Sequence, residues 1–85
     1  MAQSSYKEPN LLILGRAVKL MREQSGMSAD ELADASGVIR ERIGALEAGQ
    51  LDPTYELLLE IADGLGTQPS ALVILAEQLD ASPNP

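Results

Sequence analysis

Apolar residues recur along the chain with the spacing of amphipathic α-helices, in several short segments. Leu11, Leu14, Val18 and Met21 form one stripe, and apolar positions in 57–65 and 72–79 form two others. The period-two alternation that is typical of half-buried strands is missing. The pattern therefore predicts an all-α fold, with five helices once the shorter segments between these stripes are included.

Helix-capping residues mark where the first two helices begin and end. Asn10 is placed to cap the first helix, which we expect Gly26 to stop. Ser28 and Glu31 have the spacing of a capping box at the start of the second helix. Gly37 predicts that this second helix ends after only two turns.

Similar signals divide the second half of the chain. A third helix is predicted over 39–48, and Thr54 is expected to cap a fourth. Gly64 and Gly66 are interpreted as the stops of that helix, and Pro69 suits the first turn of a fifth.

The two ends of the chain differ from its middle in composition. Residues 1–9 are polar and predict a flexible arm, residues 10–79 predict one folded domain, and residues 80–85 predict a flexible tail.

The second and third predicted helices share a particular internal spacing. Ala33 is small enough for a close helix crossing, and Gly37 tolerates the positive φ that a tight turn requires. Val38, Ile43 and Leu46 are placed to hold the third helix against the core. The residues left on its outer face are Ile39, Arg40, Glu41, Gly44, Ala45 and Ala48.

This arrangement resembles the helix-turn-helix of the phage-repressor and Cro type, also called the Xre family. The resemblance covers residues 11–79 and is carried by Leu14-Gly15, Leu20-x-Arg22, Gly26-Met27-Ser28, Leu32-Ala33, Gly37-Val38, Leu46-Glu47-x-Gly49, Pro53-Thr54 and Ile61-Ala62-x-x-Leu65-Gly66. It implies a five-helix, lambda-repressor-like DNA-binding domain whose third helix enters the major groove, usually as a homodimer that regulates transcription. It also implies a structural salt bridge between Arg22 and Glu47.

The outer face of the third helix supplies the expected DNA contacts. Arg40 is the candidate for bidentate reading of guanine, with a solvated surface arginine as the alternative. Glu41 is placed to accept from cytosine or to pair with a neighbouring arginine, and Ile39 to contact a thymine methyl. Gly44 and Ala45 leave the helix bare, which allows close approach to DNA or is simply neutral.

Three further basic residues are candidates for phosphate contacts. Arg42 lies about 200° around the helix from Arg40 and suits a flanking phosphate. Arg16 and Lys19 are expected on the outer side of the first helix, within reach of the DNA backbone.

Two residues and one loop depart from the family pattern, and together they are expected to weaken DNA binding. Ala29 replaces a common glutamine that donates to phosphate, and Ile39 replaces a capping serine or threonine. The loop of residues 48–52, usually basic, contains Asp52 and no base. Since phosphate contacts supply most nonspecific affinity, we expect binding that is weaker, more salt-sensitive or more dependent on dimerisation.

The fifth helix carries more apolar residues than one inward stripe can use. Leu72 to Leu75 are consecutive, so Val73 or Ile74 must face outward in a monomer. We expect these two to form a homodimer interface, with the C-terminal tail as the alternative cover. Tyr55, in contrast, is expected to be a partly buried packing residue.

Composition and charge exclude several classes of function. The chain has 85 residues, no Cys and no His, which removes thiol and imidazole chemistry and the common metal ligands. We expect no enzyme activity, no metal, no cofactor and no small-molecule ligand. The absence of a signal peptide or long apolar run predicts a cytoplasmic protein without membrane contact.

The net charge of −7 is unevenly distributed, which leaves a second function open. Residues 1–42 are neutral, whereas 43–85 contain seven acids and no base. The leading prediction is a sequence-specific regulator of transcription, with repression favoured. The alternatives are a protein-interaction module or an antitoxin-type partner of a basic protein, either with weak DNA binding.

Overall fold

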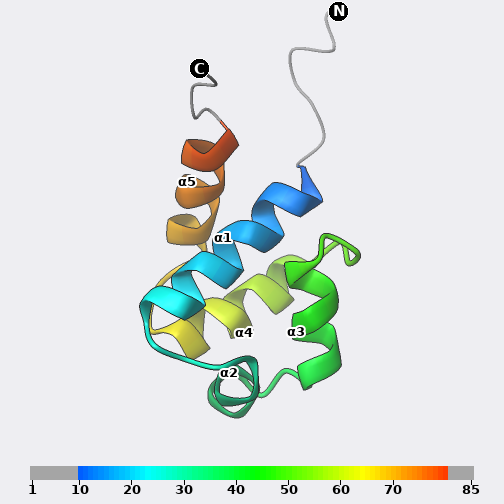
Figure 1. The fold of residues 1–85 in the computed structure, drawn as a ribbon, viewed down its shortest axis with the longest axis vertical. Coiled ribbons are helices and arrows are strands. Elements are labelled where there is room, and N and C mark those ends of the chain that lie inside the picture. Colours follow the sequence, from blue (N-terminus) through cyan, green and yellow to red (C-terminus); the bar gives the residue numbers. More distant parts are fainter. Residues whose placement is uncertain (1–9, 81–85) are drawn as a thin grey trace, which may run out of the picture.

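The computed structural model describes residues 10–80 and consists of five helices connected by short loops (Figure 1). The helices are α1 (Leu11–Gln24), α2 (Ala29–Ser36), α3 (Arg40–Glu47), α4 (Tyr55–Leu65) and α5 (Pro69–Asp80). No strand occurs within residues 10–80, so the all-α prediction is confirmed. The arm predicted for 1–9 lies outside the described residues. The tail predicted for 80–85 also lies outside them, except that Asp80 is the last residue of α5 and does not belong to a tail.

The predicted caps define the helix starts. The Asn10 side chain accepts hydrogen bonds from the first amides of α1, and the Thr54 hydroxyl accepts one from the Leu57 amide. At the start of α2, Ser28 and Glu31 satisfy each other's backbone amides, which is the predicted capping box. Each of these helices thus begins where its sequence signal predicts.

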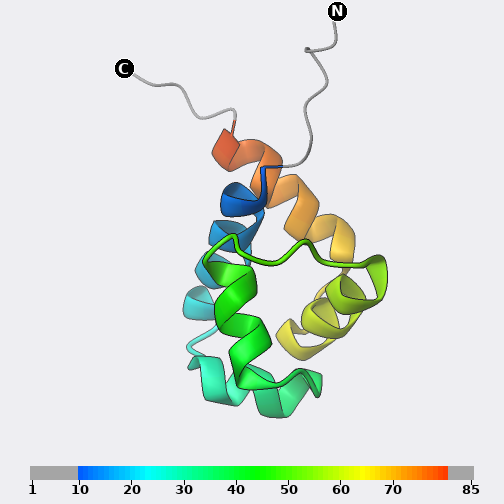
Figure 2. The ribbon, with the colours of Figure 1, turned by 90° about the vertical axis from the view of Figure 1, so that its right-hand side faces the viewer.

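One core joins all five helices. α1 packs along α5 and α2 packs along α4, while α3 contacts both α1 and α2. In both views α2 lies at one end of the molecule, and the end of α5 lies at the other (Figures 1 and 2). The central buried side chains are Val18, Leu32, Val38, Ile43, Leu46, Leu57, Ile61, Ala62 and Leu72. Val18, Val38, Ile43 and Leu46, which were predicted to face inward, are in this set, whereas Met21 is only partly buried and packs against it.

The structure corrects the role assigned to Gly64. α4 continues through this residue, ends at Leu65 and is capped by Gly66 with a positive φ of 75°. A Cβ built on Gly64 would lie 2.7 Å from the Cβ of Ser36. Gly64 is therefore where α4 approaches α2 closely, and only Gly66 acts as the helix stop.

Candidate nucleic-acid interface

A tight turn positions α3 across α2. Gly37 ends α2 with a φ of 78°, which suits glycine because it has no Cβ. The Val38 amide donates to the Ser36 hydroxyl at 3.2 Å, and the Val38 side chain is buried in the core. The direction of α3 is thus fixed at its start by the turn and by one apolar anchor.

The far end of α3 is fixed by an ion pair to α1. Arg22 Nε lies 2.7 Å from Glu47 Oε2, and Arg22 Nη2 donates to Oε1 at 3.0 Å. Arg22 Nη1 also donates to the Met27 carbonyl at 2.9 Å, which ties in the loop before α2. Both side chains are about nine-tenths buried. The pair implied by the resemblance is therefore present, with this third contact in addition.

The charge state of Arg22 is insensitive to ordinary pH. The hydrogen bonds that Arg22 donates to the Glu47 carboxylate are the main cause that raises the pKa of Arg22 above its usual value, against the opposing effect of burial. Because the pKa of Arg22 is higher in the folded than in the unfolded state, protonated Arg22 stabilises the fold at every pH below the unfolded-state pKa. This contribution is lost only as pH rises through the raised folded-state pKa. Arg22 therefore stays protonated throughout the ordinary pH range.

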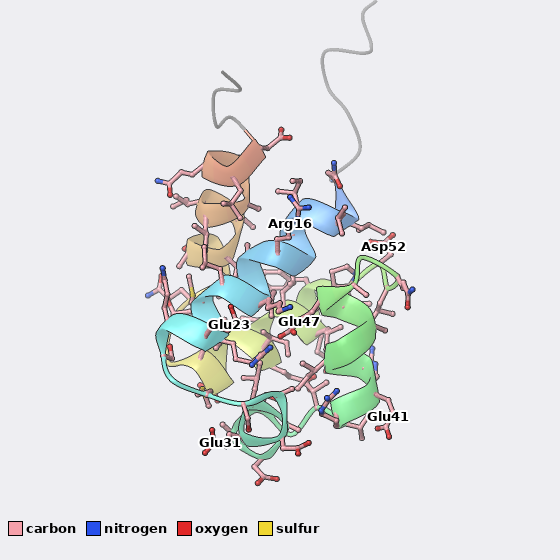
Figure 3. The ribbon with its side chains drawn as sticks, in the orientation of Figure 1. Arg16, Glu23, Glu31, Glu41, Glu47 and Asp52 are labelled. Atoms are coloured by element: carbon pink, nitrogen blue, oxygen red, sulfur yellow. The ribbon has the colours of Figure 1, made fainter. Side chains whose placement is uncertain are left out.

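Helix α1 touches α3 directly through backbone at Gly15. A Cβ on this residue would lie 2.3 Å from the Leu46 carbonyl oxygen and 2.7 Å from that of Glu47. Figure 3 shows Glu47 in the space between α1 and α3, and Glu41 pointing outward from the start of α3. The close crossing and the ion pair together hold α3 with one face outward.

The residues predicted for this outward face differ in exposure. Ile39, Arg40, Glu41 and Ala48 are exposed, whereas Gly44 and Ala45 are half-buried. Arg42 is also exposed, about 200° around the helix from Arg40. Ile39 is the N-cap of α3 but makes no side-chain cap hydrogen bond, and 60% of its surface is exposed. In Figure 2 this helix lies toward the viewer, well away from α5. α3 thus presents a mixed polar and apolar surface to solvent.

One contact on this face was not predicted. Arg40 Nε lies 3.2 Å from Asp30 Oδ1, so α2 and α3 are joined by an exposed ion pair. Asp30 lies in the first turn of α2. The partners are ten positions apart in the sequence, and their proximity depends on the crossing of the two helices.

Comparison with known proteins identifies this arrangement. A family model described as a helix-turn-helix domain matches residues 13–73, from α1 into α5. The chain belongs to the helix-turn-helix family, of the Xre type. In helix-turn-helix terms, α2 is the first helix of the motif and α3 is the recognition helix.

Individual relatives agree with this assignment. The HTH-type transcriptional regulator SutR of Escherichia coli is 35% identical over 60 residues, which are 71% of this chain and 34% of that protein. The competence pilus inhibition repressor of Acinetobacter baylyi is 31% identical over 71 residues, which are 84% of this chain and 64% of that protein. The chain therefore spans about a third of the first relative and just under two-thirds of the second.

A solved structure has the same helix-turn-helix fold. The crystal structure of the clp gene regulator ClgR from C. glutamicum superimposes with a TM-score of 0.80 at 28% identity. The match covers 91% of this chain and all of that one. The likeness therefore extends over the whole five-helix domain, beyond the two helices of the motif.

The remaining predicted residues lie away from the outer face of α3. Arg16 and Lys19 are exposed on α1. Arg16 is the residue after Gly15, where α1 crosses α3 (Figure 3). Asp52 lies in the loop after the recognition helix. No helix within residues 10–80 is long and apolar enough to cross a membrane, and no three acidic side chains of this region form a metal-binding group.

A shallow apolar groove lies between α4 and α5, and no residue of the recognition helix lines it. Its volume is about 490 Å³, and it is lined by Tyr55, Leu58, Gln68, Pro69, Ser70, Val73 and Ile74. Val73 and Ile74 are both exposed, as the run of four apolar residues predicts. Tyr55 is 69% exposed, so its predicted role in packing is wrong; it lies at the start of α4, where its ring borders the groove.

Proposed function

We propose that this protein is a sequence-specific DNA-binding regulator of transcription whose recognition helix α3 enters the major groove. The observation that carries the proposal is the outward face of α3, held at both ends by Val38 and by the Arg22–Glu47 pair. A rigidly mounted helix with exposed Arg40 at its start matches the way helix-turn-helix proteins read base edges.

Contacts to the DNA backbone would come from residues around the recognition helix. Arg42 on α3, and Arg16 and Lys19 on α1, are exposed cations for flanking phosphates. The loop after α3 contributes Asp52 instead of a base, which reduces nonspecific affinity. Dimerisation would compensate by placing two recognition helices on one site.

The groove at α4 and α5 is the surface proposed for that dimer. Val73 and Ile74 expose an apolar patch beside Tyr55, and no residue of the recognition helix lines the groove. A two-fold dimer formed there would bind a two-fold operator. Repression by occlusion of a promoter is the simplest mechanism, and one relative is named a repressor.

Selection of binding sites from random duplex DNA tests the proposal. We expect an enriched two-fold motif, with affinity that falls steeply as salt rises because phosphate contacts release counterions. Arg40→Ala should weaken binding to the winning site by about 1–3 kcal/mol and relax the preference at one base position. Absence of any enriched sequence at low salt would contradict the proposal.

A protein-interaction module is the second candidate function. It is favoured by the acid-rich second half of the sequence, by Asp52 beside the recognition helix and by the apolar groove. Its partner would be a basic protein, attracted by the charge of α4 and α5. Failure of DNA selection, together with salt-sensitive capture of a basic protein, would favour this function over the first.

A further inference from the structure

Asp30 and Arg40 connect the two helices of the motif at its solvent-facing side. Asp30 lies in the first turn of α2, and Arg40 is the first residue of α3. Their side chains are 83% and 52% exposed, so water and salt screen the ion pair in the free protein. The contribution of this ion pair to the stability of the fold is therefore small.

The guanidinium of Arg40 has neighbours on two sides. Its Nε lies 3.2 Å from Asp30 Oδ1, which is an ion-pair distance. Its Nη1 lies above Gly44, where a Cβ would stand 3.4 Å away. Because Gly44 has no side chain, the guanidinium lies close to the helix surface.

Within residues 10–80, the Nη1 and Nη2 atoms donate no side-chain hydrogen bond, and the Arg40 side chain is about half exposed, so this end of the guanidinium can bind another acceptor. Two parallel N–H groups at this end match the O6 and N7 acceptors of guanine in the major groove. A base contact of this kind is directional, so its discrimination depends on how well the guanidinium plane is oriented beforehand.

We propose that Asp30 is a specificity-determining residue, which orients Arg40 across Gly44 so that its free end reads a guanine. Asp30 itself touches no base and acts through Arg40 as a positioning residue. This inference rests on the proposed DNA-binding function and adds a second helix to the base-reading machinery.

The charge of Asp30 gives this role a distinctive signature. A carboxylate on the DNA-facing side repels phosphates, so its removal should strengthen binding to unrelated DNA. The same removal should weaken discrimination at the base that Arg40 reads. If Asp30 served only the stability of α2, its removal would not increase affinity for unrelated DNA while decreasing discrimination at the guanine.

The test compares Asp30→Asn with Asp34→Asn on the intact chain. Asp34 is also exposed on α2 and has no ion-pair partner among residues 10–80, so its variant removes the same charge without the contact. Affinities are measured for the selected duplex, for duplexes with each guanine replaced, and for unrelated DNA. Thermal unfolding by circular dichroism checks that both variants remain folded.

We expect Asp30→Asn to reduce discrimination at one guanine by up to about fivefold, which is the upper value for exposed ion pairs, and to raise affinity for unrelated DNA. Asp34→Asn should raise affinity for unrelated DNA and leave discrimination unchanged. In an Arg40→Ala background, Asp30→Asn should have no further effect on discrimination.

Two results would overturn the inference while leaving DNA binding intact. One is full guanine discrimination in Asp30→Asn, and the other is an equal loss in Asp30→Asn and Asp34→Asn. If the parent chain selects no duplex sequence at all, the proposed function fails and the inference fails with it.

Discussion

The ion pair between Arg22 and Glu47 is the best-buried polar contact within residues 10–80. It joins α1 to the end of α3, and the same guanidinium holds the Met27 carbonyl. Charges in this setting are destabilising when left alone, because the remaining partner stays desolvated. Arg22 therefore depends on Glu47 to remain inside the domain.

Glu47→Ala is expected to lower the free energy of unfolding by about 3 kcal/mol, because it leaves Arg22 buried without a counterion. Glu41→Ala removes an exposed acid from the same helix and should cost at most about 1 kcal/mol, through its interaction with the helix dipole. Urea unfolding followed by circular dichroism compares the two. Equal losses would show that the buried pair contributes no more than a surface charge.

Ile39 links helix stability and recognition at a single position. It is the N-cap of α3 without a side-chain cap bond, and it is largely exposed. Ile39→Ser supplies the missing acceptor and should stabilise the domain by about 1 kcal/mol. The same change removes an apolar contact to a thymine methyl, so specific DNA affinity should fall as the melting temperature rises.

Ile39→Ala is the matched control for this pair of effects. It removes the apolar side chain without adding a cap, so affinity should fall with no gain in stability. If Ile39→Ser bound the selected site as tightly as the parent chain, the proposed thymine contact would be wrong.

At the scale of elements, helix crossings depend on glycines that lie inside helices. Gly15 places the α1 backbone against the last carbonyls of α3, with no room for a Cβ. Gly44 lies on the outer side of α3, where a Cβ would meet only the end of the flexible Arg40 side chain. The two positions therefore predict opposite outcomes for the same substitution.

Gly15→Ala should destabilise the domain by about 1–3 kcal/mol, because α1 and α3 must move apart to admit the methyl group. Gly44→Ala should stabilise it by up to about 1 kcal/mol, since alanine is the better helix former and little stands in its way. Thermal melts of both variants are the measurement. A stabilising effect of Gly15→Ala would mean that the crossing is looser than its geometry indicates.

Local sequence signals predicted the elements well, whereas their mutual approach could not be predicted. Capping at Asn10, Ser28 and Thr54 depends on neighbouring residues only, so these starts follow from the sequence. Gly64 was assigned as a stop because nothing in the sequence reveals that Ser36 lies against it.

The site shows the same division between local and long-range information. The exposed face of α3 follows from helical periodicity and from the resemblance. The Ala33 and Gly37 pattern predicts that α2 and α3 cross closely, but it does not specify that the Asp30 and Arg40 side chains meet there. The exposed position of Tyr55 likewise depends on how α5 packs beside α4.

At the scale of the whole molecule, the exposed arginines and the apolar groove lie on different helices. Arg40 and Arg42 lie on α3, whereas α4 and α5 carry only acidic charged residues and border the apolar groove. A polyanion is therefore repelled least in one orientation, with α3 foremost and α5 turned away. In that orientation the groove stays accessible to a second copy of the chain.

Ile74→Glu tests whether this groove is the dimer interface. Ile74 is 52% exposed beside the groove, so a glutamate is tolerated in the monomer but places two like charges at a two-fold contact. At a concentration where the parent chain is a dimer, we expect the Ile74→Glu variant to be a monomer by light scattering. Its specific DNA affinity should also fall, because two half-sites are no longer bound together.

Ile39→Glu is the matched control. It places the same charge at a similarly exposed isoleucine at the start of the recognition helix, so it should weaken DNA binding and leave the dimer intact. A parent dimer that retains its mass in Ile74→Glu would place the interface elsewhere, and a monomeric parent chain would refute the dimer itself. The contrast between the two isoleucines thus separates loss of the DNA contact from loss of the second subunit, two effects that a DNA-binding assay by itself would confuse.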